Sequence, residues 1–181
     1  MASLLPRIWL MTDETRGDAA GAMMRLPRGA AVIFRHYGAP DREAAGARLH
    51  ELARERGLVF LIAGDPRLAA RLRADGFHAP EALAHRLVAA RRLMPRGLMT
   101  LAAHGAAGLV NARRHAPDAV ILSPVFPTAS HPGAAALGPL RFAALAHASS
   151  RPVIALGGMT ARRFGRLKGA GAHGFAGISF A

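Results

Sequence analysis

Short apolar runs recur along the chain, and each is followed by turn-forming residues and then by a segment whose apolar positions have helical spacing. Apolar runs of roughly four to eight residues between turn signals are typical of buried parallel strands, whereas apolar positions three and four residues apart indicate a helix that packs by one face. The expected strands cover residues 8–12, 30–35, 58–63, 76–78, 97–103, 119–122, 153–156 and 174–179. The expected helices cover residues 19–26, 41–56, 81–93, 105–115, 140–148 and 161–170, and a further helix opens at Asp65 and Pro66.

This regular alternation of strands and helices predicts the fold class. Alternating elements with short loops indicate parallel βαβ units, and eight strands favour a closed (β/α)8 TIM barrel over an open sheet. With 181 residues the barrel is compact, and we expect residues 1–181 to form a single domain. The sequence ends at Ala181, just after the eighth expected strand, so the pattern predicts no eighth helix. Either the barrel has an open flank there, or a partner subunit in a homodimer covers the first and last strands.

Residues 152–160 combine a strand, a tight turn and the start of a helix. An apolar strand leads into Gly157 and Gly158, and a threonine that is a good N-cap precedes the next helix. Backbone N–H groups at such a turn can face a phosphate group. The loops after strands seven and eight of a barrel commonly share a phosphate site, so Ile178 and Ser179 are expected to contribute. The alternative is an ordinary turn between a strand and a helix.

Composition narrows the classes of function. The formal net charge is +13, and arginine carries nearly all of the positive charge. The arginines are spread along the expected helices without interleaved aromatic residues, which indicates a solvated basic surface that favours small anionic ligands over nucleic acid. The absence of cysteine excludes disulfides and thiolate metal sites. Because no apolar run has the roughly 20 residues of a membrane span and no signal-peptide core is present, we expect a cytoplasmic protein without a membrane partner.

Polar side chains follow several expected strands, at the end where a barrel carries its active site. The residues there that offer chemistry are Arg35, His36, His78, His104, Thr128, Ser130 and His131. His104 ends the fifth strand, and an imidazole can act as a base near neutral pH. Two alternatives are a histidine that only packs at the strand end and a zinc site built from these histidines, for which no known ligand spacing is present.

Several of these segments resemble the thiamine phosphate synthase family, which includes the related thiazole tautomerases. The similar segments are residues 9–13, 34–35, 74–78, 103–104, 123–128, 154–160, 170–174 and 178–179. The resemblance covers essentially the whole chain, and its most specific parts are Pro-Val-Phe-Pro-Thr and Gly-Gly-Met-Thr. It implies a barrel whose mouth binds a thiazole phosphate or thiamine phosphate. The phosphate and substrate ligands that it implies are Gly157, Gly158, Ile178, Ser179, Arg35, Thr128, Ser130 and His131.

The chain departs from the synthase pattern where the resemblance implies a Mg²⁺–pyrophosphate site. Synthases end the third strand in Asn-Asp and carry another aspartate after the fourth strand, whereas this chain has Ala63-Gly64 and Leu83. Glycine and leucine side chains do not offer the oxygen ligands that Mg²⁺ requires. We therefore expect no metal or other cofactor, unless Asp65 or Glu81 replaces the missing aspartates.

By contrast, the chain keeps the residues that the resemblance assigns to a single phosphate. This difference favours a tautomerase-like member, in which a base moves a proton on a thiazole carboxylate phosphate. His104 matches the histidine position of the tautomerases and is the expected catalytic residue. Two alternatives are an active thiamine phosphate synthase and a non-catalytic protein that binds a thiamine precursor.

Overall fold

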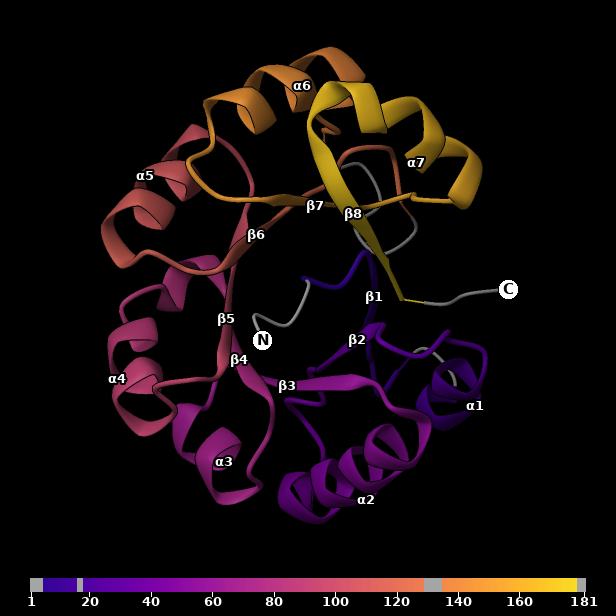
Figure 1. Ribbon diagram of the computed structural model, residues 1–181, viewed down its shortest axis with the longest axis vertical. Coiled ribbons are helices and arrows are strands. Elements are labelled where there is room, and N and C mark those ends of the chain that lie inside the picture. The colour runs from indigo at the N-terminus through magenta and orange to yellow at the C-terminus, as the bar shows by residue number, and fades with distance from the viewer. Residues whose placement is uncertain (1–4, 16–17, 129–134, 179–181) are drawn as a thin grey trace.

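The computed structural model describes residues 5–15, 18–128 and 135–178. Within these residues, eight strands form a closed barrel in which each strand pairs in parallel with its neighbours, and β1 pairs with β8 (Figure 1). Trp9 of β1, for example, lies opposite Ala31 of β2 and Ala176 of β8. The strands are β1 (Ile8–Met11), β2 (Ala31–Phe34), β3 (Val59–Ala63), β4 (Gly76–Ala79), β5 (Leu98–Ala103), β6 (Ala119–Leu122), β7 (Val153–Leu156) and β8 (Ala172–Gly177). The expected (β/α)8 TIM barrel is confirmed.

The helices form a ring around the strands (Figure 1). In the described residues, the α-helices are α1 (Ala19–Met24), α2 (Arg42–Arg56), α3 (Pro66–Arg71), α4 (Arg86–Leu93), α5 (Ala106–His115), α6 (Gly138–Ala148) and α7 (Ala161–Leu167). Side-chain caps place the starts of three of them. As the sequence predicts, the Thr160 hydroxyl accepts a hydrogen bond from the backbone N–H of Arg163 in α7. The Asp41 carboxylate accepts a hydrogen bond from the backbone of Ala44 in α2, and the Asp65 carboxylate accepts two from Arg67 and Leu68 in α3.

The helix expected over residues 81–93 forms two elements instead of one. The first is a 3₁₀ turn, η1 (Glu81–Leu83), and the second is α4. The backbone N–H groups of Leu83 and Ala84 donate to the carbonyls of Pro80 and Glu81, each three residues earlier. This tighter hydrogen-bonding pattern delays the α-helix to Arg86 and leaves Glu81 in the turn directly after β4.

The last strand also differs from its expected range of 174–179, because it begins and ends two residues earlier. The preceding helix, α7, ends at Leu167, and the chain continues as a 3₁₀ turn, η2 (Lys168–Ala170). Gly171 then adopts the left-handed conformation, with φ of 86°, and the chain enters β8 at once. As a result, Ile178 follows the strand instead of belonging to it.

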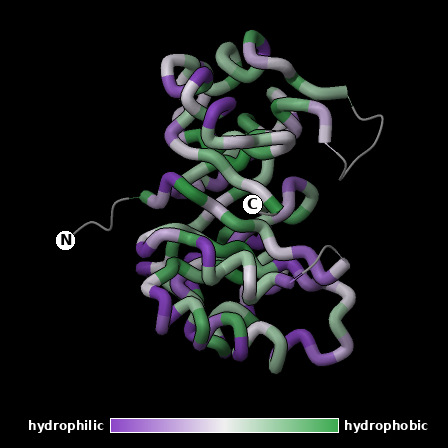
Figure 2. Tube along the Cα trace, turned by 90° about the vertical axis from the view of Figure 1, so that its right-hand side faces the viewer, coloured by the Kyte–Doolittle hydropathy of each residue, from purple (hydrophilic) through white to green (hydrophobic). Residues whose placement is uncertain are grey.

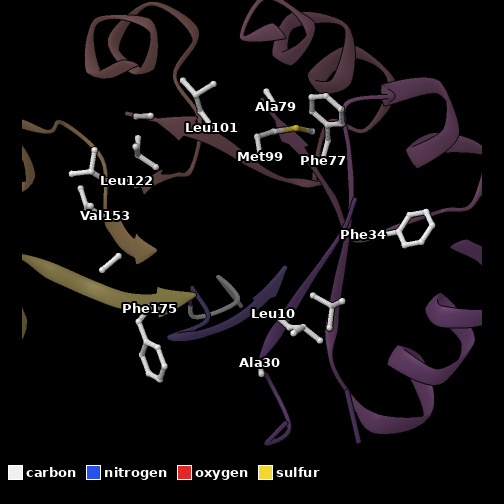
Figure 3. Close-up of a cluster of buried hydrophobic side chains, with 14 of the residues drawn as sticks. Leu10, Ala30, Phe34, Phe77, Ala79, Met99, Leu101, Leu122, Val153 and Phe175 are labelled. Atoms are coloured by element: carbon white, nitrogen blue, oxygen red, sulfur yellow. The ribbon is translucent and has the colours of Figure 1, made fainter. Parts of the chain in front are cut away.

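The core has two apolar layers, one on each side of the barrel wall. Alternate residues of each strand point to opposite faces, so one set fills the barrel and the other packs beneath the helices. The interior set is Trp9, Met11, Ala31, Ile33, Leu61, Ala63, Ala119, Ile121, Ile154 and Ala176. Figure 3 shows members of the outer set, among which Phe34 and Phe175 point away from the barrel axis.

The flank formed by the first and last strands is closed as a sheet. β1 and β8 pair along three positions, from Ile8 opposite Phe175 to Leu10 opposite Gly177. On the outer side, the Phe175 ring packs against Phe164 of α7 with ring centroids 4.9 Å apart. Figure 2 shows apolar strand segments running through the middle of the molecule and hydrophilic positions alternating along the surrounding helices. The homodimer considered for this flank stays a prediction.

Candidate functional site

The carboxyl ends of the eight strands lie at one end of the barrel, as parallel pairing requires. We call the residues that directly follow the strands at this end the barrel mouth. The mouth includes Thr12, Asp13, Arg35, His36, Gly64, Asp65, Glu81, His104, Gly157, Gly158 and Ile178. Two of the loops that carry them, after β4 and β5, are joined by a carboxylate–imidazole contact.

His104 follows β5, and Glu81 of η1 holds it. The backbone N–H of His104 donates to Glu81 Oε2 at 2.8 Å, and His104 Nδ1 lies 2.6 Å from the same oxygen. The Glu81 side chain is 23% exposed, whereas the His104 side chain is 59% exposed. The carboxylate therefore sits beneath the imidazole, and the ring is open to solvent at the mouth. His104 thus lies at the mouth as expected, while its catalytic role stays a prediction, and Glu81 is a partner that the sequence did not identify.

The diglycine turn after β7 is packed against the loop that follows β6. Gly157 and Gly158 have φ of 98° and 60°, a conformation that favours glycine. A Cβ atom on Gly157 would lie 2.9 Å from Pro124, and one on Gly158 would lie 2.7 Å from the Pro127 carbonyl oxygen. A side chain at either position would collide first with the loop after β6, so the glycines are required for this close approach.

Backbone hydrogen bonds join the same two loops. The N–H of Val125 donates to the Leu156 carbonyl at 2.8 Å, and the N–H of Phe126 donates to the Gly157 carbonyl at 3.1 Å. The loop after β6 thus runs beside the diglycine turn and forms one wall of the mouth.

Arg163 adds a positive charge at the diglycine turn. Its guanidinium donates a hydrogen bond to the Gly158 carbonyl and lies 4.7 Å above the Phe126 ring. Arg163 is in the first turn of α7, where the helix dipole disfavours a cation. Arg163 was not among the predicted site residues, although a basic residue in a first helical turn is the signal that could have identified it.

Arg35 ties together the ends of β1 and β2. Its backbone N–H donates to Thr12 Oγ1 at 3.1 Å, and its Nε donates to the Thr12 carbonyl at 3.0 Å. One terminal nitrogen also forms a 3.2 Å ion pair with Asp13. Arg35 therefore lies at the mouth as expected, in a position fixed by the first strand.

The end of β3 carries guanidinium groups near the place where the synthase pattern has an aspartate. Arg42 donates to the Ala63 carbonyl at 2.7 Å, and Arg86 donates to the Gly64 carbonyl at 2.6 Å. A Cβ atom on Gly64 would lie 3.0 Å from the Tyr37 ring, and the φ of Gly64 is 77°. An added acidic side chain would therefore meet both backbone strain and an aromatic ring at this position.

Asp65 and Glu81, the two alternative Mg²⁺ ligands, are already engaged. Asp65 Oδ1 accepts hydrogen bonds from two backbone N–H groups at the start of α3, at 2.9 and 3.0 Å. Glu81 Oε2 accepts from His104. No group of three or more histidine or acidic side chains able to hold a metal occurs among the described residues. Each carboxylate thus already has one oxygen that accepts from a backbone N–H group, and the expectation that the mouth holds no Mg²⁺ stays a prediction.

The other histidines predicted near the mouth differ in burial. His78 is 2% exposed and points into the barrel, where its Nδ1 lies 2.9 Å from Thr100 Oγ1. Burial lowers the pKa of His78 to about 3, and the nearby Arg35 charge acts in the same direction. Burial also lowers the pKa of His36, while Glu14 and Asp13 oppose that effect. His78 is therefore a neutral interior group and not a base at the mouth.

The remaining predicted ligands lie at or beyond the edges of the described segments. Thr128 is the last described residue before the gap at 129–134 in the loop after β6, and Ile178 directly follows β8. Ser130, His131 and Ser179 lie outside the described residues, and their predicted roles stay predictions.

A hollow of about 630 Å³ lies at the opposite end of the barrel, near the start of β4 and β5. Its lining residues are Ala74, Asp75, Met94, Pro95, Arg96 and Gly97. The Asp75 carboxylate in this hollow accepts a 2.8 Å hydrogen bond from the backbone N–H of Phe60. That acidic group has a structural role, and the barrel mouth is the better candidate for chemistry.

Comparisons with known proteins identify the family of this chain. A family model described as thiamine monophosphate synthase matches residues 11–181. The thiamine-phosphate synthase of Methanoculleus marisnigri is 34% identical over 188 residues, which cover 95% of this chain and 85% of that protein. The thiamine biosynthesis bifunctional protein ThiED of Geobacter sulfurreducens is 28% identical over 180 residues, and the match covers 98% of this chain but only 37% of that protein.

Among solved structures, the thiamine phosphate pyrophosphorylase from Pyrococcus furiosus has a similar fold. The two superimpose with a TM-score of 0.81 at 21% identity, covering 98% of this chain and 87% of the other. Separately, no helix in the described part of the chain is long and apolar enough to cross a membrane.

Proposed function

Because this chain belongs to the thiamine monophosphate synthase family, we propose that it binds a thiazole phosphate at the barrel mouth and transfers a proton on that ligand, as a thiazole tautomerase does. The single observation that carries the proposal is the imidazole of His104, which is exposed at the mouth and anchored to a carboxylate. An anchored imidazole that is open to solvent is suited to general acid–base catalysis.

The isomerisation needs only one base, because the ligand gives up one proton and takes one back. The imidazole of His104 takes a proton from the thiazole ring carbon of a thiazole carboxylate phosphate. The protonated imidazole then returns a proton to a different atom of the same ligand, which completes the isomerisation and restores the neutral base. An imidazole performs both steps near neutral pH because it exchanges protons readily there.

The phosphate is proposed to bind at the turn formed by Gly157 and Gly158, beside the chain that follows β8. Support comes from the left-handed conformation of the two glycines and from the guanidinium of Arg163 at the same turn. This anchor follows β7 and β8, whereas the base follows β5. Binding and proton transfer should therefore respond to different substitutions.

The family also favours a second candidate, because relatives of this chain are named thiamine-phosphate synthases. Synthase activity requires that the negative charge of the departing pyrophosphate be neutralised. A bound Mg²⁺ would supply the positive charge for this. The engagement of Asp65 with α3 and of Glu81 with His104 argues for the tautomerase proposal over this one.

The test is an isomerisation assay with a thiazole carboxylate phosphate, using wild type, His104→Ala and the control His147→Ala on the exposed side of α6. Removal of a positioned base should lower the rate about 10²- to 10⁴-fold. Affinity for the ligand should change little in either variant, because neither histidine belongs to the proposed phosphate anchor.

Two results would contradict the proposal. Binding by the wild type without turnover would favour the precursor-binding alternative. A His104→Ala variant as fast as the wild type would show that another group is the base.

A further inference from the structure

We infer that Glu81 is a positioning residue for His104, holding its imidazole in the tautomer that carries the proton on Nδ1 and leaves Nε2 as the base. This inference rests on the proposed function, since it assigns the reactive nitrogen of the proposed base. It concerns a contact between two loops that are 23 residues apart in the sequence.

The shared oxygen determines the direction of the hydrogen bonds. Glu81 Oε2 accepts from the backbone N–H of His104 at 2.8 Å, and a backbone N–H can only donate. An ionised carboxylate only accepts hydrogen bonds, so the 2.6 Å contact with Nδ1 requires a proton on that nitrogen. In the neutral imidazole, the other nitrogen, Nε2, then carries the lone pair.

The two contacts also restrict the orientation of the ring. One hydrogen bond fixes the backbone of His104 and the other fixes its imidazole, and both end on one oxygen of Glu81. A flexible histidine at the edge of a loop would otherwise sample several rotamers. Holding a reacting group in one orientation is a large part of catalysis, because a displacement of about 1 Å can cost about 10²-fold in rate.

The carboxylate is itself confined by α5. A Cβ atom added to Gly108 would lie 3.1 Å from Glu81 Oε1 and 2.5 Å from the Cβ of Ala103. The absence of a side chain at Gly108 thus makes room for the carboxylate against the end of β5. As the imidazole accepts a proton during the reaction, this carboxylate lies beside the positive charge that develops.

The test compares Glu81→Ala with Glu81→Gln, and uses Glu51→Ala on the exposed face of α2 as a control. Nitrogen NMR on histidine-labelled protein reports which ring nitrogen of His104 carries the proton, and needs no turnover. The wild type and Glu81→Gln should show the proton on Nδ1, because the amide oxygen can accept the same two hydrogen bonds. Glu81→Ala should show a mixture of tautomers.

Kinetics with the thiazole carboxylate phosphate provide the second measurement. Glu81→Ala should lower kcat about 10²-fold with little change in KM, since Glu81 does not belong to the phosphate anchor. Glu81→Gln should retain more of the rate because it keeps the orientation and loses only the charge. Glu81→Gln also keeps the test decisive if Glu81→Ala fails to fold.

The outcomes separate this inference from the proposed function. Wild-type protein with the proton on Nε2, or a Glu81→Ala variant with unchanged tautomer and unchanged kcat, would overturn the inference. Wild-type protein that shows the Nδ1 proton, loses it in Glu81→Ala and yet has no isomerase activity would support the contact and refute the tautomerase proposal.

Discussion

His78 provides a prediction about folding stability that can be worked out from the structure. Its imidazole lies inside the barrel against Thr100, and burial lowers its pKa from 6.5 to about 3. The unfolded chain therefore binds a proton at His78 below about pH 6.5, whereas the native chain does not. The stability contributed by the neutral imidazole is present above pH 6.5 and is lost as the pH falls toward 3.

The magnitude follows from the linkage between proton binding and folding. One proton bound only by the unfolded state lowers the free energy of unfolding by about 1.4 kcal/mol for each pH unit. Between pH 7 and pH 5, with an unfolded pKa of 6.5, the loss from His78 is about 2 kcal/mol. This range lies above most carboxylate titrations, so it isolates the histidines.

The assay is denaturant unfolding at pH 7 and pH 5 for wild type and His78→Gln, in which an amide can face Thr100 but cannot titrate. From pH 7 to pH 5, the free energy of unfolding should fall by about 2 kcal/mol more in the wild type than in His78→Gln. The contribution of His36, whose pKa is also lowered, is present in both proteins and cancels in the difference. His147→Gln controls for the loss of a histidine, and an equal pH dependence in wild type and His78→Gln would refute the reasoning.

Two further predictions concern the mouth. Gly158→Val should lower the free energy of unfolding by about 1–3 kcal/mol and weaken thiazole phosphate binding, because its side chain meets the Pro127 carbonyl and its φ of 60° disfavours a branched residue. Denaturant unfolding and ligand titration measure both effects, and unchanged affinity would contradict the proposed anchor. Isomerisation should be unaffected by a metal chelator. The purified protein should form thiamine phosphate only very slowly when Mg²⁺ is added. Efficient Mg²⁺-dependent synthesis would show that Asp65 or Glu81 does bind the metal.

The barrel could be predicted from the sequence because its signals are local. Each strand is a short apolar run, and residues such as Asp41 and Asp65 mark helix starts by hydrogen bonding to backbone only two or three residues ahead. The diglycine turn could be placed for the same reason. The less accurate boundaries, at residues 81–93 and 174–179, occur where 3₁₀ turns replace regular helix, since the two helix types share much of their sequence signal.

The partners within the mouth could not be predicted in this way. Glu81 and His104 are 23 residues apart and meet only because β4 and β5 pair in a particular register. The sequence assigned Glu81 to a helix start, where an acidic residue is common and needs no further explanation. The collision of a Gly158 side chain with Pro127 likewise depends on how two distant loops pack.

The pairing of β1 with β8 has a consequence for how the protein is made. β1 obtains one of its two neighbours only when residues near Phe175 have also been synthesised. Until then β1 presents an unpaired edge, which is a site for pairing with other chains. Closure also joins segments that are far apart in the sequence, such as Ile8 and Phe175, and such distant contacts form slowly. Chaperone contact during synthesis should therefore concentrate on nascent chains that lack β8.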